Sequence, residues 1–103
     1  MIGIVDLNCC NIGSVRNMLD YLNIENIIIK DKEFLSNCSK IILPGLGSFD
    51  YAIKNMHDLD LFDEIKIQIL NNKKPILGIC LGMHILGTSS EEGKLSGLNV
   101  LDM

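Results

Sequence analysis

The sequence has no excess of basic residues and no long apolar run, and each absence excludes a class of protein. Nine Lys and Arg against thirteen Asp and Glu give a net charge of −4, so the chain has no electrostatic footprint for nucleic acid or an anionic membrane surface. No apolar run approaches the ~20 residues that span a bilayer. The first residues, Met1–Asp6, lack a basic flank and a small-residue cleavage site. They are therefore expected to form a strand and not a signal peptide.

The four cysteines have neither the spacing of a metal clip nor an evident disulfide partner. They stand at positions 9, 10, 38 and 80, and a disulfide between the neighbours Cys9 and Cys10 would be strained. Together with His57 and His84 they make a poor zinc set, because no pair has ligand spacing. We therefore expect no metal, no cofactor, and free thiols in a reducing compartment, which places the protein in the cytoplasm.

What is present is enough for one hydrophobic core, since 48% of the 103 residues are hydrophobic and 21% are charged. Short β-branched runs predict buried strands, and apolar residues at helical spacing predict helices. The expected strands are Ile2–Val5, Asn26–Ile29, Lys40–Leu43, a fourth from Pro75 to Cys80 and a fifth at Leu98–Leu101, and the expected helices are 12–22, 49–56, 61–70 and 81–87. This alternation predicts an α/β fold with a parallel sheet.

Four polar or cyclic residues predict where these elements begin and end. Asn11 is expected to cap the helix at 12–22, and Asn23 is expected to end it. Asp31 is expected to cap a single helical turn before the third strand. Pro44 is expected to cut that strand off.

The segment Pro75–His84 predicts a reactive cysteine. Its Gly78-Ile79-Cys80-Leu81-Gly82 core has the form of a nucleophile elbow, G-x-S-x-G with sulfur in place of oxygen. A strand-to-helix turn projects the thiol above the sheet, and the helix N-terminus that follows favours the thiolate. The alternative is a buried cysteine in a tight βα turn.

A cysteine nucleophile needs donors for the oxyanion that develops during attack on an amide or ester. The backbone N–H of Leu81 is one candidate, and the glycine-rich loop Pro44–Ser48 offers another. Taken alone, that loop is more simply a tight βα turn, and the elbow is what favours the oxyanion interpretation. Ligands of parallel sheets bind beyond the carboxyl ends of the strands, so we expect this loop, the segment Asp6–Asn11 and Cys80 to converge at one edge.

The nucleophile also needs a base, and neither histidine suits that role. His84 follows Cys80 by four residues and would point along the elbow helix. His57 lies in a polar segment between two predicted helices and is expected at the surface.

These residues resemble class I glutamine amidotransferases. Gly78–Met83 matches the nucleophile motif of that family, and three further stretches favour the glutaminase subunits of imidazole glycerol phosphate synthases. Those stretches are Asn11–Val15, Leu43–Phe49 and Ser89–Gly93. The resemblance runs along the entire chain and implies a three-layer α/β fold with a parallel sheet. Residues 1–103 would then be the N-terminal part of a single domain, truncated before its last strands.

The resemblance also implies a reaction. Cys80 would attack the side-chain carboxamide of glutamine, giving a γ-glutamyl thioester and ammonia, while backbone N–H groups of Leu81 and Gly45 hold the oxyanion. The residues that would contact the bound glutamine are Gly47, His84 and Glu92. The ammonia would pass to a (β/α)₈-barrel cyclase partner that makes imidazole glycerol phosphate in histidine biosynthesis.

Three departures from the family pattern leave alternatives open. The first loop, Asp6–Asn11, lacks the two usual glycines, although Asn8 tolerates positive φ better than most residues. His84 stands where glutamine is usual. The His-x-Glu segment that supplies the family's catalytic base is not among these 103 residues, so the chain alone is expected to be inactive, as a fragment or a truncated gene product. A non-catalytic remnant, a paralogue supplying another synthase, and a cysteine hydrolase with a similar elbow are the alternatives.

Overall fold

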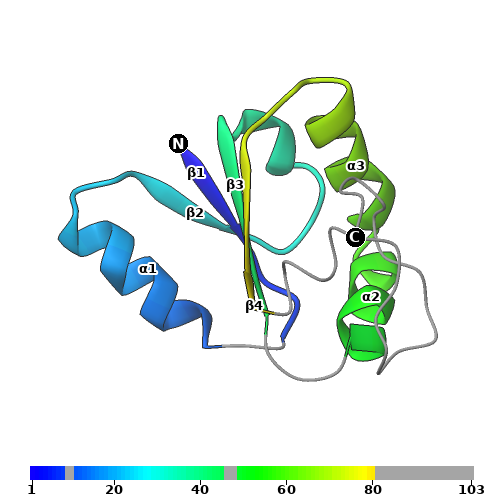
Figure 1. The fold of residues 1–103 in the computed structure, drawn as a ribbon, viewed down its shortest axis with the longest axis horizontal. Coiled ribbons are helices and arrows are strands. Elements are labelled where there is room, and N and C mark those ends of the chain that lie inside the picture. Colours follow the sequence, from blue (N-terminus) through cyan, green and yellow to red (C-terminus); the bar gives the residue numbers. More distant parts are fainter. Residues whose placement is uncertain (9–10, 46–48, 81–103) are drawn as a thin grey trace.

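The computed structural model describes residues 1–8, 11–45 and 49–80 (Figure 1). In chain order its elements are β1 (Ile2–Val5), α1 (Ile12–Tyr21), β2 (Asn26–Ile29), the 3₁₀ turn η1 (Leu35–Asn37), β3 (Lys40–Gly45), α2 (Phe49–Asp58), α3 (Phe62–Leu70) and β4 (Ile76–Cys80). The strands and helices predicted for this part of the chain are confirmed, with ends that differ by a few residues. The predicted helix at 81–87 and strand Leu98–Leu101 lie outside the described residues.

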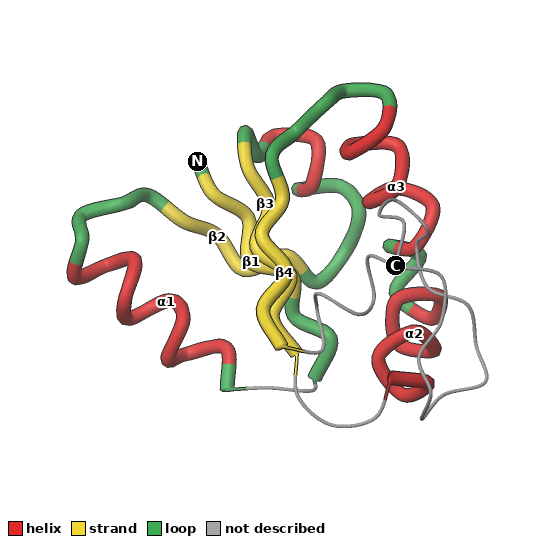
Figure 2. Tube along the Cα trace, viewed as in Figure 1, coloured by secondary structure: helices red, strands yellow, loops and turns green. Residues whose placement is uncertain are grey.

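The four strands form one parallel sheet in the order β2-β1-β3-β4. Helix α1 covers one face of this sheet, and α2 and α3 cover the other, which gives three layers (Figures 1 and 2). The sheet, its parallel pairing and the layers agree with the predicted fold class. Among the described residues, no helix is long and apolar enough to cross a membrane.

The two central strands, β1 and β3, have buried side chains on both faces. Ile4, Val5, Ile41 and Leu43 are each exposed by 1% or less, as expected for the continuous apolar runs of a doubly covered parallel sheet. One group of these side chains packs under α2, α3 and η1, and the other packs under α1. The sheet is therefore held by a core on each side.

The end of α1 is formed as predicted. Asn23 has a φ of 58°, its N–H donates to the carbonyl of Asp20 at 3.0 Å, and the next N–H, of Ile24, donates to Leu19 at 2.9 Å. This pair of bonds with a left-handed residue is the Schellman ending, in which asparagine is the usual substitute for glycine.

Two other boundary predictions need correction. Asn11 does precede α1, but its side chain makes no capping hydrogen bond. The Oδ1 atom of Asp31 accepts the N–H of Glu33 at 3.0 Å, yet the helical turn is a 3₁₀ turn that lies further along, at Leu35–Asn37. Asn11 thus marks the start of α1 without the predicted side-chain bond, whereas the Asp31 side chain stabilises a turn and does not start a helix there.

Pro44 does not end β3, contrary to prediction. It pairs with Ile79 of β4, whereas the pairing of β3 with β1 stops at Ile42. The N–H of Ile41 donates to Pro75 on the β4 side at 3.0 Å, so the alternation of a parallel strand turns the nitrogen of Pro44 toward β1, beyond the end of that ladder. A proline is tolerated there because no hydrogen bond needs its missing donor.

Candidate active site

The carboxyl ends of β1, β3 and β4 lie at one edge of the sheet, seen at the bottom of Figure 2. Gly45 and Cys80 are the last residues of β3 and β4, and they are direct partners in the register. Adjacent strands are ~4.8 Å apart, so the backbone of the predicted oxyanion glycine adjoins that of the predicted nucleophile. The convergence of the β1 exit loop, Gly45 and Cys80 at this edge is confirmed for the described part of these segments.

The loop that leaves β1, Asp6–Asn8, is held in a defined conformation. The Oδ1 atom of Asp6 accepts the N–H of Asn8 at 3.0 Å, and the Asp6 N–H donates to the carbonyl of Ile29 at 3.0 Å. The Oδ2 atom lies 4.0 Å from Nζ of Lys30, which is largely exposed. Asn8 has a φ of 58°, so asparagine here adopts the backbone conformation that glycine would otherwise supply.

Leu7 of the β1 exit loop and the start of α1 pack on opposite faces of the sheet. The side chain of Leu7 is 1% exposed and belongs to the core under α2 and α3, whereas Ile12 and Val15, which follow in α1, pack against the opposite core. The carbonyl of Leu7 accepts a hydrogen bond from Nδ2 of Asn55 in α2, at 2.6 Å. Asn55 was not among the residues predicted for the site. The only signal in the sequence is that Asn55 lies next to the apolar residues expected to face the core, and this does not identify its partner.

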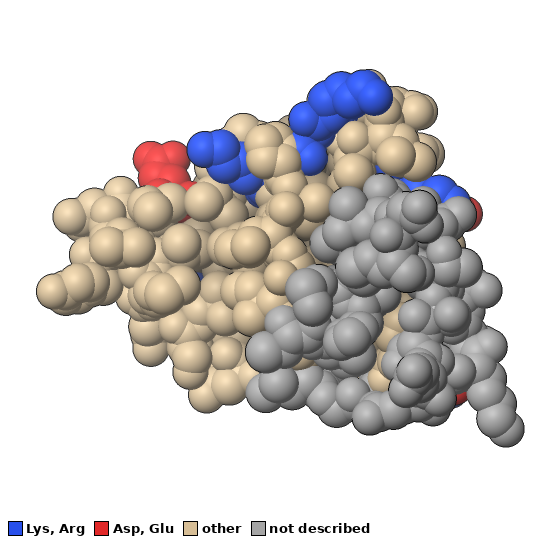
Figure 3. Space-filling model, viewed as in Figure 1, with Lys and Arg blue, Asp and Glu red and all other residues tan. Residues whose placement is uncertain are grey.

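Figure 3 shows where the described charges lie on one face of the molecule. Among the described residues, Lys and Arg are seen mostly along the upper rim of this view, and the described atoms at its centre and lower left are uncharged. In the part of the chain that the structure describes, there is no group of three or more His, Cys, Asp or Glu able to hold a metal ion.

The described histidine, His57, is at the surface, as predicted. Its ring stacks on Phe62 at the corner between α2 and α3, with centroids 4.2 Å apart and planes inclined by 19°. Eight residues separate it from Phe49 at the start of α2, a rise of about 12 Å along the helix. His57 therefore sits at the far end of α2 from the carboxyl edge.

The described free cysteine, Cys38, has the opposite character to a nucleophile. It is 2% exposed, and burial raises the pKa of its thiol, so the unreactive protonated form is favoured. Its Sγ donates a weak hydrogen bond to the carbonyl of Phe34 at 3.5 Å. This residue is a structural thiol.

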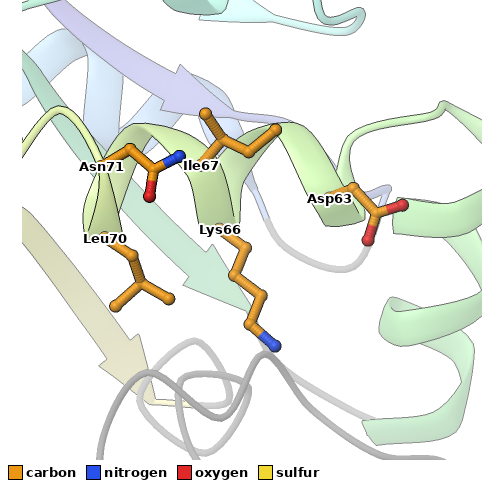
Figure 4. Close-up of a pocket in the computed structure, with 5 residues that line it drawn as sticks. All are labelled: Asp63, Lys66, Ile67, Leu70 and Asn71. Atoms are coloured by element: carbon orange, nitrogen blue, oxygen red, sulfur yellow. The ribbon is translucent and has the colours of Figure 1, made fainter.

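A shallow hollow of about 440 Å³ lies on α3 (Figure 4), lined by Asp63, Lys66, Ile67, Leu70 and Asn71. It contains none of the residues predicted for the site. The side chain of Cys80 and the predicted site residues Leu81, Gly47, His84 and Glu92 lie outside the described residues, and their roles remain predictions.

The chain is similar to proteins of known kind over almost its whole length. It is 45% identical over 102 residues to "Imidazole glycerol phosphate synthase subunit HisH 2" of Methanococcus maripaludis, covering 99% of this chain and 50% of that protein. It is 48% identical over 100 residues to the HisH subunit of Prochlorococcus marinus, covering 97% of this chain and 46% of that protein. The chain thus spans about half the length of the relatives it matches.

The fold has a counterpart among solved structures, a "Crystal structure of glutamine amidotransferase" with a TM-score of 0.82 and 22% identity, covering 97% of this chain and 52% of that one. At that identity the likeness bears on the fold, and it agrees with the three-layer parallel architecture. The sequence profile of the SNO glutamine amidotransferase family matches residues 11–103. The chain belongs to this glutamine amidotransferase family.

Proposed function

We propose that this chain carries the nucleophile of a glutaminase. The Cys80 thiolate attacks the side-chain carbonyl carbon of glutamine, and the carbon–nitrogen bond breaks as the nitrogen takes up a proton and leaves as ammonia. Water then hydrolyses the γ-glutamyl thioester to glutamate and returns the thiol. Both steps are acyl transfers that need neither metal nor redox cofactor.

The observation that carries the proposal is the register pairing of Gly45 with Cys80 at the carboxyl edge. Ligands of parallel α/β sheets bind at this edge, and an oxyanion must lie within hydrogen-bond reach of both the nucleophile and its donors. We assign the donor role to the backbone N–H groups of Leu81 and Gly45. The substrate contacts in this proposal are Gly47, His84 and Glu92.

The base that activates Cys80 is proposed to come from outside these 103 residues. His57 is directed to the α2–α3 corner, where it stacks on Phe62, and His84 shares a helical turn with the cysteine in the predicted elbow. The 103 residues alone are accordingly expected to be inactive.

The acceptor of the ammonia is proposed from the names of the relatives. Several proteins that are 41–48% identical over nearly the whole chain are subunits of imidazole glycerol phosphate synthase. We propose a (β/α)₈-barrel cyclase subunit as the partner, in a heterodimer that acts in histidine biosynthesis in the cytoplasm. The family profile carries a different name, SNO, and we base the acceptor on the relatives because they are 45–48% identical over 97–99% of this chain.

The test is glutamate release from glutamine by the product of the complete reading frame, mixed with a cyclase subunit. Turnover should fall about 10³-fold or more in Cys80→Ala, because the covalent intermediate can no longer form. Cys38→Ala is the matched control, since that thiol is buried and should leave turnover within a few-fold of wild type. Equal activity of wild type and Cys80→Ala would refute the proposal.

A further inference from the structure

Helix α2 is connected to the carboxyl edge at two points. It begins at Phe49, four residues after Gly45 ends β3, and in its middle the Asn55 side chain reaches across to the β1 exit loop. The bond from Nδ2 of Asn55 to the Leu7 carbonyl is 2.6 Å long and joins residues 48 apart in the sequence. Helix α2 therefore follows β3, which ends at Gly45, and contacts the β1 exit loop.

Asn55 sits on the flank of the buried face of α2. The core-facing residues of this helix are Phe49, Ala52, Ile53 and Met56, and Asn55 is partly buried beside them. The Asn55 amide donates a hydrogen bond to the backbone carbonyl of Leu7. The side chain of Leu7 is itself buried, with 1% of its surface exposed.

The bond matters because it adds direction to the apolar packing of Leu7, which also holds the exit loop on the α2 side. Within the loop, Asp6 accepts the N–H of Asn8, and it joins β2 through its N–H and through Lys30. Those interactions stabilise the turn of the loop and join it to the carboxyl end of β2. Asn55 provides a hydrogen bond that connects the loop to α2, the helix that follows β3.

We infer that Asn55 is a positioning residue, whose side-chain amide holds the β1 exit loop at the carboxyl edge in register with the Gly45 loop and Cys80. The inference rests on the proposed function for the reaction that this arrangement serves. Asn55 touches no reacting atom, and it acts through the Leu7 carbonyl. Losing its donor should loosen the loop and impair recognition of glutamine while leaving the intrinsic reactivity of Cys80 unchanged.

The experiment compares wild type with Asn55→Leu, which keeps the branched shape and removes the donor, in the product of the complete reading frame. Backbone hydrogen exchange of Asn8 should become about tenfold faster when the bond is lost. Cys80 should then react several-fold more slowly with a chloroketone analogue of glutamine, but at an unchanged rate with iodoacetamide. Asn37→Leu, an exposed asparagine of η1 near the amino end of β3, is the matched control and should change neither rate.

Unchanged exchange at Asn8 would overturn the inference, and so would an equal loss of rate with both reagents, which indicates general destabilisation. If Asn55→Leu does not fold, Asn55→Asp tests the same donor with almost no change of shape. If wild-type Cys80 shows no preference for the glutamine analogue, the proposed function is what fails. Hydrogen exchange at Asn8 then decides alone whether Asn55 holds the loop.

Discussion

The two faces of the sheet are covered very unequally in the part of the chain described here. On the α2–α3 face, thirteen buried residues form one continuous cluster, whereas the cluster under α1 has three, Ile4, Leu19 and Ile42. Leu77 of β4 shares a face with Ile79, which packs on the α1 side, and Leu77 is 56% exposed. The stabilising core is therefore concentrated on one side of the sheet.

The carboxyl edge depends on that stronger side. The β1 exit loop is anchored through the buried side chain of Leu7 and its bond to Asn55, both on the α2–α3 face. A site at the edge is thus supported by the face that carries most of the buried area. Truncating a side chain on one face of the sheet should therefore change the free energy of unfolding by a different amount from truncating one on the other face.

The largest effect is expected from Ile53→Ala in α2. Ile53 is 1% exposed within the α2–α3 cluster, so the truncation should lower the free energy of unfolding by about 2–5 kcal/mol through lost burial and the cavity left behind. Leu77→Ala, on the other face, is the matched control and should change it by about 0.5 kcal/mol or less. Urea unfolding followed by circular dichroism measures both. Equal losses in the two variants would contradict the asymmetry.

A smaller effect is expected from Gly3→Ala in β1. A Cβ at this position would lie 2.6 Å from Sγ of Cys38 and 3.0 Å from Cγ1 of Ile29, so one side chain must shift, at about 1–3 kcal/mol. In a double-mutant cycle, Cys38→Ala should recover much of this loss because it removes the closer atom. Strictly additive effects would show that the strain arises elsewhere.

The smallest effect concerns pH and the same thiol. Burial raises the pKa of Cys38 above 9.0, the ordinary value, so above this pH the unfolded chain loses the thiol proton more readily than the folded one. The contribution of Cys38 is fully present below the unfolded pKa and declines as the pH rises through the folded pKa. Thermal unfolding from pH 8 to 10 should therefore show a steeper loss of stability in wild type than in Cys38→Ala. Identical slopes would exclude Cys38 as the titrating group.

Local chemistry was sufficient to predict much of the fold. Ile2–Val5 and Asn26–Ile29 are apolar runs that match the observed strands residue for residue, and Asn23 ends α1 because asparagine accepts a left-handed backbone. The prediction that Pro44 ends the third strand was wrong. A proline is costly in a strand only where the neighbouring strand needs the N–H that proline lacks. That neighbour is known only from the sheet order.

The candidate site was predictable to the extent that parallel topology brings segments together. Alternating strands and helices are enough to bring Gly45 and Cys80 to one edge, and the register agrees. The bond from Asn55 to Leu7 and the packing of Gly3 against Cys38 were not predictable. Each joins segments more than thirty residues apart, and nothing local in the sequence specifies the approach.

The role proposed for Cys80, a nucleophile for glutamine at the carboxyl edge, can be tested on the thiol itself. The most direct test is to treat the product of the complete reading frame with a chloroketone analogue of glutamine and to map the adduct by mass spectrometry. We expect modification of Cys80, protection by excess glutamine, and no modification of the buried Cys38. An unmodified Cys80, or labelling that glutamine does not slow, would contradict the proposed role.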